Sequence, residues 1–291
     1  MKVFMPFLLC VSLLLLSSCQ SEEQLPQPSS DTQELTFSVT NYYQYGFPDI
    51  TRADAAEKLA HLAFAVFDAD ADTLVIPIAI QDRGSEGYGT FKVSLPQGKY
   101  RLLFLGYDGN RSLLLTSSRA VAFAEDYVPH TFMYSTILQV GPSMNPSFDI
   151  VLRRVVAAFR LSLLDAIPDQ VQRFCMKSDV GGAVLNAQTG FCSNSSGRTA
   201  YISIPSDSHS KPGIYLTYYL YLPSTETVAD LTLSALDAEG KALRSRTFSQ
   251  VPMAVNRLTV YEGEFFSEDS FNSSSNITVD YDWSDTLSVK F

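Results

Sequence analysis

Side chains that could perform acid–base or metal chemistry are few in this sequence and lie far apart. The three histidines are His61, His130 and His209, and none belongs to an HExxH pattern or has a second ligand four residues later. The sequence has neither a GxSxG nucleophile elbow nor a glycine-rich phosphate loop. We therefore predict a binding or assembly protein and not an enzyme, with no cofactor and no metal ion.

One acidic cluster could hold a cation. Asp68, Asp70 and Asp72 have the spacing that begins an EF-hand calcium loop. That loop also needs glycine at its sixth position and glutamate at its twelfth, where this chain has Thr73 and Ala79. We therefore interpret the cluster as a solvated turn between two strands.

The thiol with the clearest chemical role is Cys19. It follows one basic residue, Lys2, an uncharged apolar run at 3–16, and the small residues Ser17 and Ser18. A charged start, a short apolar core and small residues form a secretory signal, and this run is shorter than the ~20 residues of a spanning helix. The segment around Cys19 resembles the bacterial lipobox, in which the cysteine thiol accepts lipid and becomes the mature N-terminus. An ordinary secretory signal with an incidental cysteine is the alternative.

The residues after Cys19 have the composition of a stalk. Glu22 and Glu23 are followed by a stretch at 24–30 that is rich in proline, glutamine and serine, which cannot bury a core. An acidic pair here also resembles the surface-export signal of Bacteroidetes lipoproteins. We predict a signal peptide at 1–18, a lipidated flexible stalk at 19–34, and an outer-membrane, surface-exposed location.

Composition restricts the remaining possibilities. The formal charge of −10 argues against nucleic acid and anionic membrane surfaces as partners. The 46% hydrophobic content is ample for packed cores, and the length allows two domains. Cys175 and Cys192 remain after Cys19 and the signal-peptide Cys10. They could form a disulfide in an exported protein or stay as two buried free thiols.

The pattern along the chain alternates at a period of two, which predicts strands. Short strands separated by glycine, aspartate and proline indicate an all-β protein built from β-sandwiches. A glycine–proline stretch at 141–146 places a predicted boundary between domains at 35–145 and 146–291. The expected strands are 35–40, 59–68, 73–80, 91–95, 99–106 as the hairpin partner of 91–95, 148–164, 200–204, 213–222, 228–236, 243–248, 257–266 and 277–283, with a short helical turn at 167–174.

Several short motifs, taken in order, resemble the fimbrillins and fimbrium-anchoring lipoproteins of Bacteroidetes, which build type V pili. These motifs are Cys19 in its lipobox, Thr51-Arg52-Ala53, the strand at 59–68, the proline–glycine–tyrosine hairpin at 95–100, the arginine-rich strand at 153–157 with Ile167-Pro168, and the closing segment at 276–283. The resemblance covers most of the mature chain, although each motif alone is short.

The resemblance implies two tandem transthyretin-like β-sandwiches that assemble with other fimbrial subunits by strand donation, a form of β-augmentation. It makes Arg52 the candidate site of proteolytic processing, which would also remove the lipid on Cys19. Residues 285–291 become a candidate donor strand with apolar Leu287, Val289 and Phe291, and a final edge strand of the chain's own sheet is the alternative. We predict an anchor or accessory subunit with a lipid tether to the outer membrane.

Two other functions remain open. A carbohydrate-binding surface lipoprotein of a glycan-uptake system would need a patch of exposed aromatic side chains, for which Tyr215, Tyr218, Tyr219 and Tyr221 are the candidates. An exported hydrolase would need clustered carboxylates with shifted pKa values in a cleft. The sequence identifies no host or bacterial surface ligand.

Overall fold

A computed structural model describes residues 32–43, 59–142, 144–204, 208–267 and 285–290. The regular elements in these ranges are β-strands, apart from one short 3-10 turn, η1 (Ala124–Asp126). The prediction of an all-β protein is therefore confirmed. The described ranges contain no helix that is long and apolar enough to cross a membrane.

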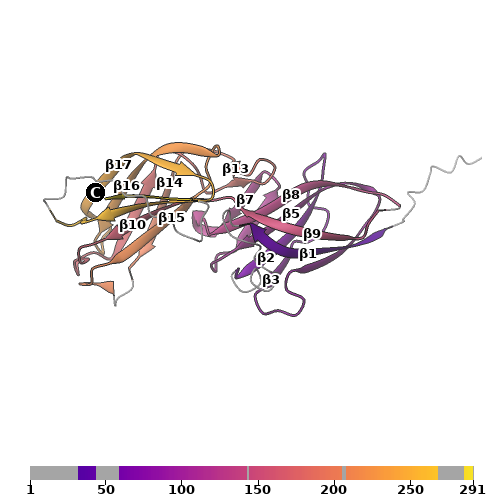
Figure 1. Ribbon diagram of the computed structural model, residues 1–291, viewed down its shortest axis with the longest axis horizontal. Coiled ribbons are helices and arrows are strands. Elements are labelled where there is room, and N and C mark those ends of the chain that lie inside the picture. The colour runs from indigo at the N-terminus through magenta and orange to yellow at the C-terminus, as the bar shows by residue number, and fades with distance from the viewer. Residues whose placement is uncertain (1–31, 44–58, 143, 205–207, 268–284, 291) are drawn as a thin grey trace, which may run out of the picture. The chain divides into compact units, whose positions relative to one another are not determined.

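The first half of the chain forms a seven-stranded sheet in the order β3-β2-β5-β8-β9-β1-β4 (Figure 1). The two ends of this sheet face one another across a common core, because Phe37 of β1 lies 5.3 Å from Phe64 of β2 and 5.4 Å from Phe104 of β5, measured between ring centroids. The strands are β1 (Gln33–Tyr43), β2 (His61–Asp68), β3 (Ala79–Asp82), β4 (Thr90–Leu95), β5 (Gly98–Tyr107), β8 (Thr131–Val140) and β9 (Ser147–Arg154).

The apolar run of β2 has a structural explanation. Phe64 and Val66 belong to the core inside the seven-stranded sheet, whereas Ala63, Ala65 and Phe67 face a second core on the opposite side. A strand that is buried on both faces reads as a continuous apolar run instead of an alternating one. The expected core strand at 59–68 is confirmed, with its first strand residue at His61.

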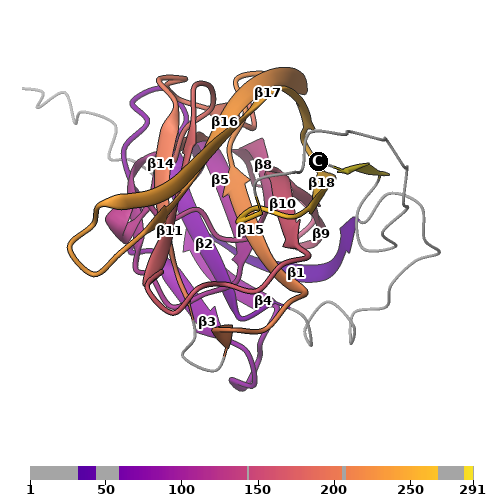
Figure 2. The same ribbon diagram turned by 90° about the vertical axis from the view of Figure 1, so that its left-hand side faces the viewer.

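The second half contains two four-stranded sheets that face each other over a third core (Figure 2). One sheet has the order β15-β10-β18-β19 and the other has the order β14-β11-β16-β17. The strands are β10 (Ala157–Leu163), β11 (Arg173–Ser178), β14 (Arg198–Ser203), β15 (Ile214–Leu220), β16 (Glu226–Leu236), β17 (Ala242–Ala254), β18 (Arg257–Gly263) and β19 (Asp285–Lys290).

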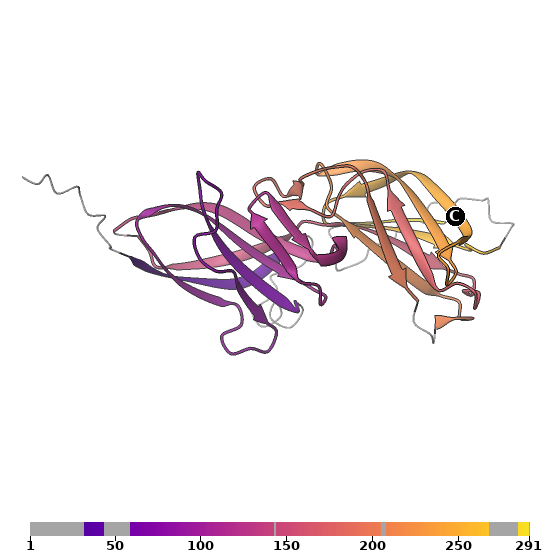
Figure 3. The ribbon, with the colours of Figure 1, turned by 180° about the vertical axis from the view of Figure 1, so that it is seen from behind.

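A small sheet connects the two halves, in the order β13-β12-β7-β6 (Figure 3). Val121 of β7 pairs with Leu185 of β12, and the buried Thr131 and Tyr221 hydroxyls lie 3.1 Å apart. The described residues from 32 onward consequently form one compact unit. The strands of the small sheet are β6 (Leu113–Ser117), β7 (Ala120–Phe123), β12 (Leu185–Asn186) and β13 (Phe191–Cys192).

The expected single strand at 148–164 is wrong. It is two strands, β9 and β10, separated at Val155 and Val156, and β9 belongs to the seven-stranded sheet of the first half. Both valines are buried in the core shared by the two halves, so the apolar pattern continues across the break. The chain therefore passes from the first set of strands to the second at 155–156, beyond the predicted boundary at 145–146.

Four local expectations also need correction. Residues 90–95 and 98–107 do not form a hairpin, because β4 pairs with β1 whereas β5 pairs with β2 and β8. Residues 73–80 form a bridge from Leu74 to Phe67 and then the short β3, and residues 167–174 form a turn in which Val171 N–H donates to the Pro168 carbonyl. The predicted stalk at 19–34 overlaps β1, which begins at Gln33.

Candidate functional site

β1 occupies an interior position in its sheet although it is the first described strand of the chain. It pairs with β9 in parallel register and with β4 in antiparallel register, so both of its edges are hydrogen-bonded. Val39 N–H also donates to the Gly89 carbonyl and Thr36 N–H to the Pro146 carbonyl, each over 2.7 Å. Removing β1 would leave two facing strand edges that another strand could pair with.

One face of β1 supplies a row of core side chains. Leu35, Phe37 and Val39 are 0%, 1% and 5% exposed, and the Phe37 ring also stacks on Phe148 of β9 at 5.1 Å. The intervening Ser38 is half-buried on the other face. This alternation is the pattern that a replacement strand would need to reproduce.

Two of the predicted functional residues cannot be placed. Cys19 and Arg52 lie outside the described residues. Arg52 falls in the chain segment between β1 and β2, so cleavage after it would leave β1 without a covalent link to the rest of the fold.

The C-terminal candidate strand is an edge strand in this structure. β19 pairs in parallel with β18, from Arg257–Asp285 to Glu262–Lys290, and among the described residues β18 is its one neighbour. Leu287 and Val289 belong to β19, whereas Phe291 and the expected strand at 277–283 lie outside the described residues. Of the two alternatives for the tail, the structure contains the chain's own edge strand.

The two cysteines are free. Cys175 is buried on β11 and Cys192 is half-buried on β13, and these strands belong to different sheets. Of the two alternatives that the sequence leaves open for this pair, the structure has the free thiols. Burial raises the pKa of both thiols.

The acidic cluster is built as a turn. Asp68 accepts hydrogen bonds from Ala71 N–H at 2.7 Å and Asp70 N–H at 3.0 Å, and these bonds lower the pKa of its carboxyl. Asp72 accepts from Ser118 N–H at 3.1 Å. Within the described ranges, no group of three or more histidine, cysteine, aspartate or glutamate side chains could hold a metal ion.

Two of the three histidines make contacts between strands and loops. His61 Nδ1 lies 2.7 Å from Asp82 Oδ1 on β3, and its Nε2 lies 2.8 Å from the Gly109 carbonyl oxygen. Arg154 Nε donates to His130 Nε2 over 2.6 Å, and Arg154 Nη1 donates to Asn256 Oδ1 over 2.7 Å. The two Arg154 contacts connect β9 to the segment before β8 and to the turn before β18.

The four tyrosines suggested as an aromatic patch are not arranged as one. Tyr218 and Tyr221 are buried, whereas Tyr215 and Tyr219 lie on the outward face of β15. Tyr201 on β14 is as exposed as Tyr215, at 63%, and the sequence reasoning missed it. Tyr201 is the one aromatic residue of β14, a weakly apolar strand, so the sequence gave no signal that it lies in a surface site.

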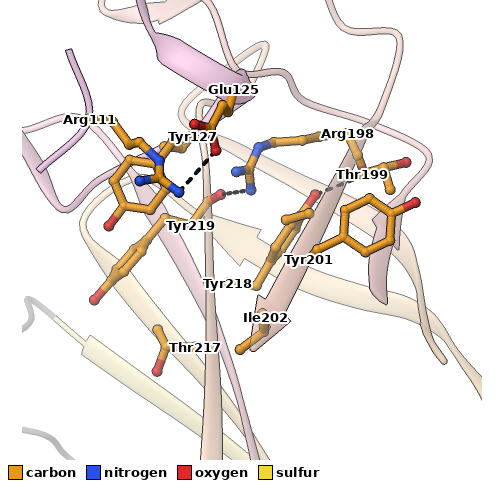
Figure 4. A pocket seen from close by; sticks show the side chains of 12 residues that line it. Arg111, Glu125, Tyr127, Arg198, Thr199, Tyr201, Ile202, Thr217, Tyr218 and Tyr219 are labelled. Carbon is orange, nitrogen blue, oxygen red and sulfur yellow. Dashed lines mark hydrogen bonds and ion pairs between the residues drawn. The ribbon is translucent and has the colours of Figure 1, made fainter. Parts of the chain in front are cut away.

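A groove lies beside Tyr201, where β14 and β15 meet the segment around η1 (Figure 4). It is a cavity of about 320 Å³, hereafter the tyrosine groove. Its lining combines aromatic rings with charged and hydroxyl groups and consists of Arg111, Glu125, Tyr127, Val128, Arg198, Thr199, Ala200, Tyr201, Ile202, Thr217, Tyr218 and Tyr219. A second cavity of about 350 Å³ shares Arg198 and Thr199 with it.

The sequence was then compared with known proteins. A family model described as a family of unknown function, DUF6562, matches residues 129–289, more than half of the chain. The chain belongs to this family. The DUF6562 match begins just before β8 and ends within β19, so it includes β14, β15 and the candidate donor strand but not β1. A search of curated proteins finds no match.

This DUF6562 member is similar to several solved structures. A Bacteroides ovatus protein described as a candidate adhesin has 16% identity and a TM-score of 0.50, over 74% of this chain and 77% of that one. A second candidate adhesin from Bacteroides ovatus has 10% identity and a TM-score of 0.49, over 75% and 82%. The fimbrial anchor protein Mfa2 from Porphyromonas gingivalis has 11% identity and a TM-score of 0.37, over 74% and 82%. At this level of identity, the first likeness shows a shared fold.

Proposed function

We propose that this chain is a lipid-anchored surface subunit of a fimbrium, an anchor or accessory subunit that associates with other subunits by strand donation through tandem transthyretin-like sandwiches. The observation that supports strand donation is the position of β1. This strand fills an interior place in its sheet, and the chain segment that joins it to β2 contains Arg52. Loss of such a strand would leave the facing edges of β4 and β9 open to a strand from another subunit.

The C-terminal strand β19 is the candidate for the strand that is donated to a neighbouring subunit. Within the described ranges β19 has one neighbouring strand, and its sequence alternates polar residues with Leu287 and Val289. Apolar residues at every second position are what the inward face of β1 presents to its core with Leu35, Phe37 and Val39. A tail of this kind can fill the place of β1 in a neighbouring subunit. The fold shared with a candidate adhesin from Bacteroides ovatus also supports a role at the cell surface.

Deletion of residues 285–291 tests the proposal. We expect the truncated chain to keep its β-rich circular dichroism spectrum, because only an edge strand is lost, and to disappear from fibres sheared from cells. Leu287→Asn with Val289→Asn should act like the deletion, whereas Thr286→Ala with Ser288→Ala, at the intervening positions, is the matched control. Normal fibre association by the deletion variant would refute strand donation by the tail.

The choice between a retained anchor and a processed subunit depends on one peptide bond. Mass spectrometry of the mature N-terminus from cells gives a lipid on Cys19 if the chain keeps its tether. A start at Ala53 identifies a processed subunit that has lost both the lipid and β1.

A further inference from the structure

The tyrosine groove depends on Arg198 for its construction. Gly197 has φ +81° and leaves no room for a Cβ atom, which would collide with the Ser178 carbonyl oxygen. Arg198 then donates from Nε and Nη2 to the Asp126 carbonyl at 3.1 and 2.9 Å, and from Nη1 to the Tyr219 carbonyl at 2.8 Å. Its guanidinium therefore fixes η1 and β15 on opposite sides of the groove, as Figure 4 shows for the bond to Tyr219.

The wall of the groove at η1 is strained. Glu125 and Asp126 have φ values of 62° and 50°, in the left-handed region, and neither is glycine. Such conformations are strained and are concentrated at binding and catalytic sites, where surrounding contacts hold them. Here the contacts are the two bonds from Arg198 to the Asp126 carbonyl and an ion pair of 2.9 Å between Arg111 Nη2 and Glu125 Oε2.

The tyrosine rings that line the groove differ in how exposed they are. Tyr201 and Tyr127 are 63% and 37% exposed, and Tyr219, which also lines the groove, is half-buried. Burial raises the pKa of Tyr127 and Tyr219, so their hydroxyls stay neutral and can both donate and accept hydrogen bonds. The groove therefore offers flat apolar rings with polar groups between them.

The charge around the groove is opposite in sign to that of the whole chain. Arg111 and Arg198 line it, Arg160 Nε donates to Thr217 in its wall at 3.1 Å, and Arg173 lies 5.1 Å from the centre of the Tyr201 ring. Against these four cations stand Glu125, Asp126 and Asp108. The Asp108 carboxylate is close enough to act electrostatically on Tyr127 and Tyr219, and the formal charge of the whole chain is −10. The groove is therefore a locally cationic site on an acidic protein.

These features agree with one chemical class of ligand. Pyranose rings have an apolar C–H face that stacks on an aromatic ring and a rim of hydroxyls that exchange hydrogen bonds with neutral hydroxyl, amide and carbonyl groups. The second cavity continues from Arg198 and Thr199, so there is room for more than one sugar unit. Carboxylate or sulfate groups on such a chain would complement the surrounding arginines.

We propose that the tyrosine groove binds an acidic oligosaccharide, carrying uronic acid carboxylates or sulfate esters. The site uses neither β1 nor β19. It thus goes beyond strand donation, and binding of glycan by the isolated chain can succeed or fail separately from fibre association.

Isothermal titration of the full chain in detergent tests the site with four polymers: polygalacturonate, chondroitin sulfate, neutral dextran and poly-glutamate. We expect binding of polygalacturonate or chondroitin sulfate that weakens as sodium chloride is raised, and the better of the two identifies carboxylate or sulfate as the charged group. Dextran should bind at least about tenfold more weakly, because it lacks the charge. Poly-glutamate should also bind at least about tenfold more weakly, because it lacks the sugar rings.

Substitutions locate the binding in the groove. Tyr201→Ala should weaken binding about tenfold or more, and Tyr201→Phe should retain it because the ring is kept. Arg111→Gln should weaken binding, whereas Lys92→Gln, which removes one exposed charge on β4, should not. Absence of binding to both acidic polysaccharides, equal binding of poly-glutamate or dextran, or no difference between Tyr201→Ala and the native chain would each overturn the proposal.

Discussion

If β1 is an exchangeable strand, its hold on the sheet after cleavage at Arg52 should depend on a few core side chains. Leu35, Phe37 and Val39 are almost fully buried, and burial of one such side chain contributes roughly 1.5–3 kcal/mol, so together they supply roughly 5–9 kcal/mol. Phe37→Ala removes the ring that contacts Phe64, Phe104 and Phe148, at a cost of about 3–5 kcal/mol. This loss corresponds to roughly a hundredfold or greater decrease in the affinity of the protein for the cleaved β1 fragment.

The assay uses a chain with a site-specific protease sequence at residues 50–53. After cleavage, a synthetic peptide of residues 285–291 is added, and mass spectrometry follows the fraction of the β1 fragment that stays with the protein. We expect the Phe37→Ala fragment to be replaced at much lower peptide concentration than the native one. Ser38→Ala is the matched control, because Ser38 is half-buried on the opposite face of the same strand.

Two results would refute this reasoning. Equal retention of the fragment in Phe37→Ala and Ser38→Ala would mean that the core does not hold β1. Displacement by the peptide of 285–291 that is no better than by a scrambled peptide would mean that the groove does not recognise the tail. Urea unfolding of the uncut chains shows independently that the Phe37→Ala protein is folded before cleavage.

The remaining predictions concern the thiols. Cys19→Ala should release the protein from the membrane fraction, because the thiol that would carry the lipid is gone; continued retention would argue against the lipid anchor. Cys192 should react with iodoacetamide at pH 8 more slowly than a small thiol of pKa about 8.5, and the rate should keep rising above that pH, because burial raises its pKa and the thiolate is the reactive form. An unreactive Cys192 that reducing agent restores would indicate a disulfide absent from this structure.

The strand pattern of this protein could be predicted from its sequence, whereas strand pairing could not. Alternation of apolar residues marks β1 and β4 clearly, and a continuous apolar run marks β5, which is buried on both faces. The short turn at 96–97 nevertheless favoured a hairpin between β4 and β5, and tertiary packing placed these strands apart in the sheet. A tight turn between two strands therefore does not show that the two strands pair with each other.

The break at Val155 and Val156 could not be predicted for a related reason. Both valines are buried in the core between the two halves, so hydrophobicity continues where the strand ends. The tyrosine groove was also beyond sequence reasoning. Its lining comes from positions near 111, 125, 198 and 217, which are far apart in the sequence. Long-range strand pairing, of β14 with β11 and of β15 with β10, decides where these positions lie.

If the proposed strand donation occurs, the energetic difference between β1 and β19 gives it a direction. In the part of the chain that the structure describes, β19 pairs along one edge, with β18, so the hydrogen-bonding groups of its other edge depend on other partners. In the place of β1, the same strand would pair along both edges, with β4 and β9, and its apolar residues would enter a core instead of the margin of a sheet. Each added backbone bond contributes about 1 kcal/mol net, so the move is favourable only where that place is empty. With β1 present, the tail stays on its own sheet, and removal of β1 is therefore the step that would make this subunit competent to accept a neighbour.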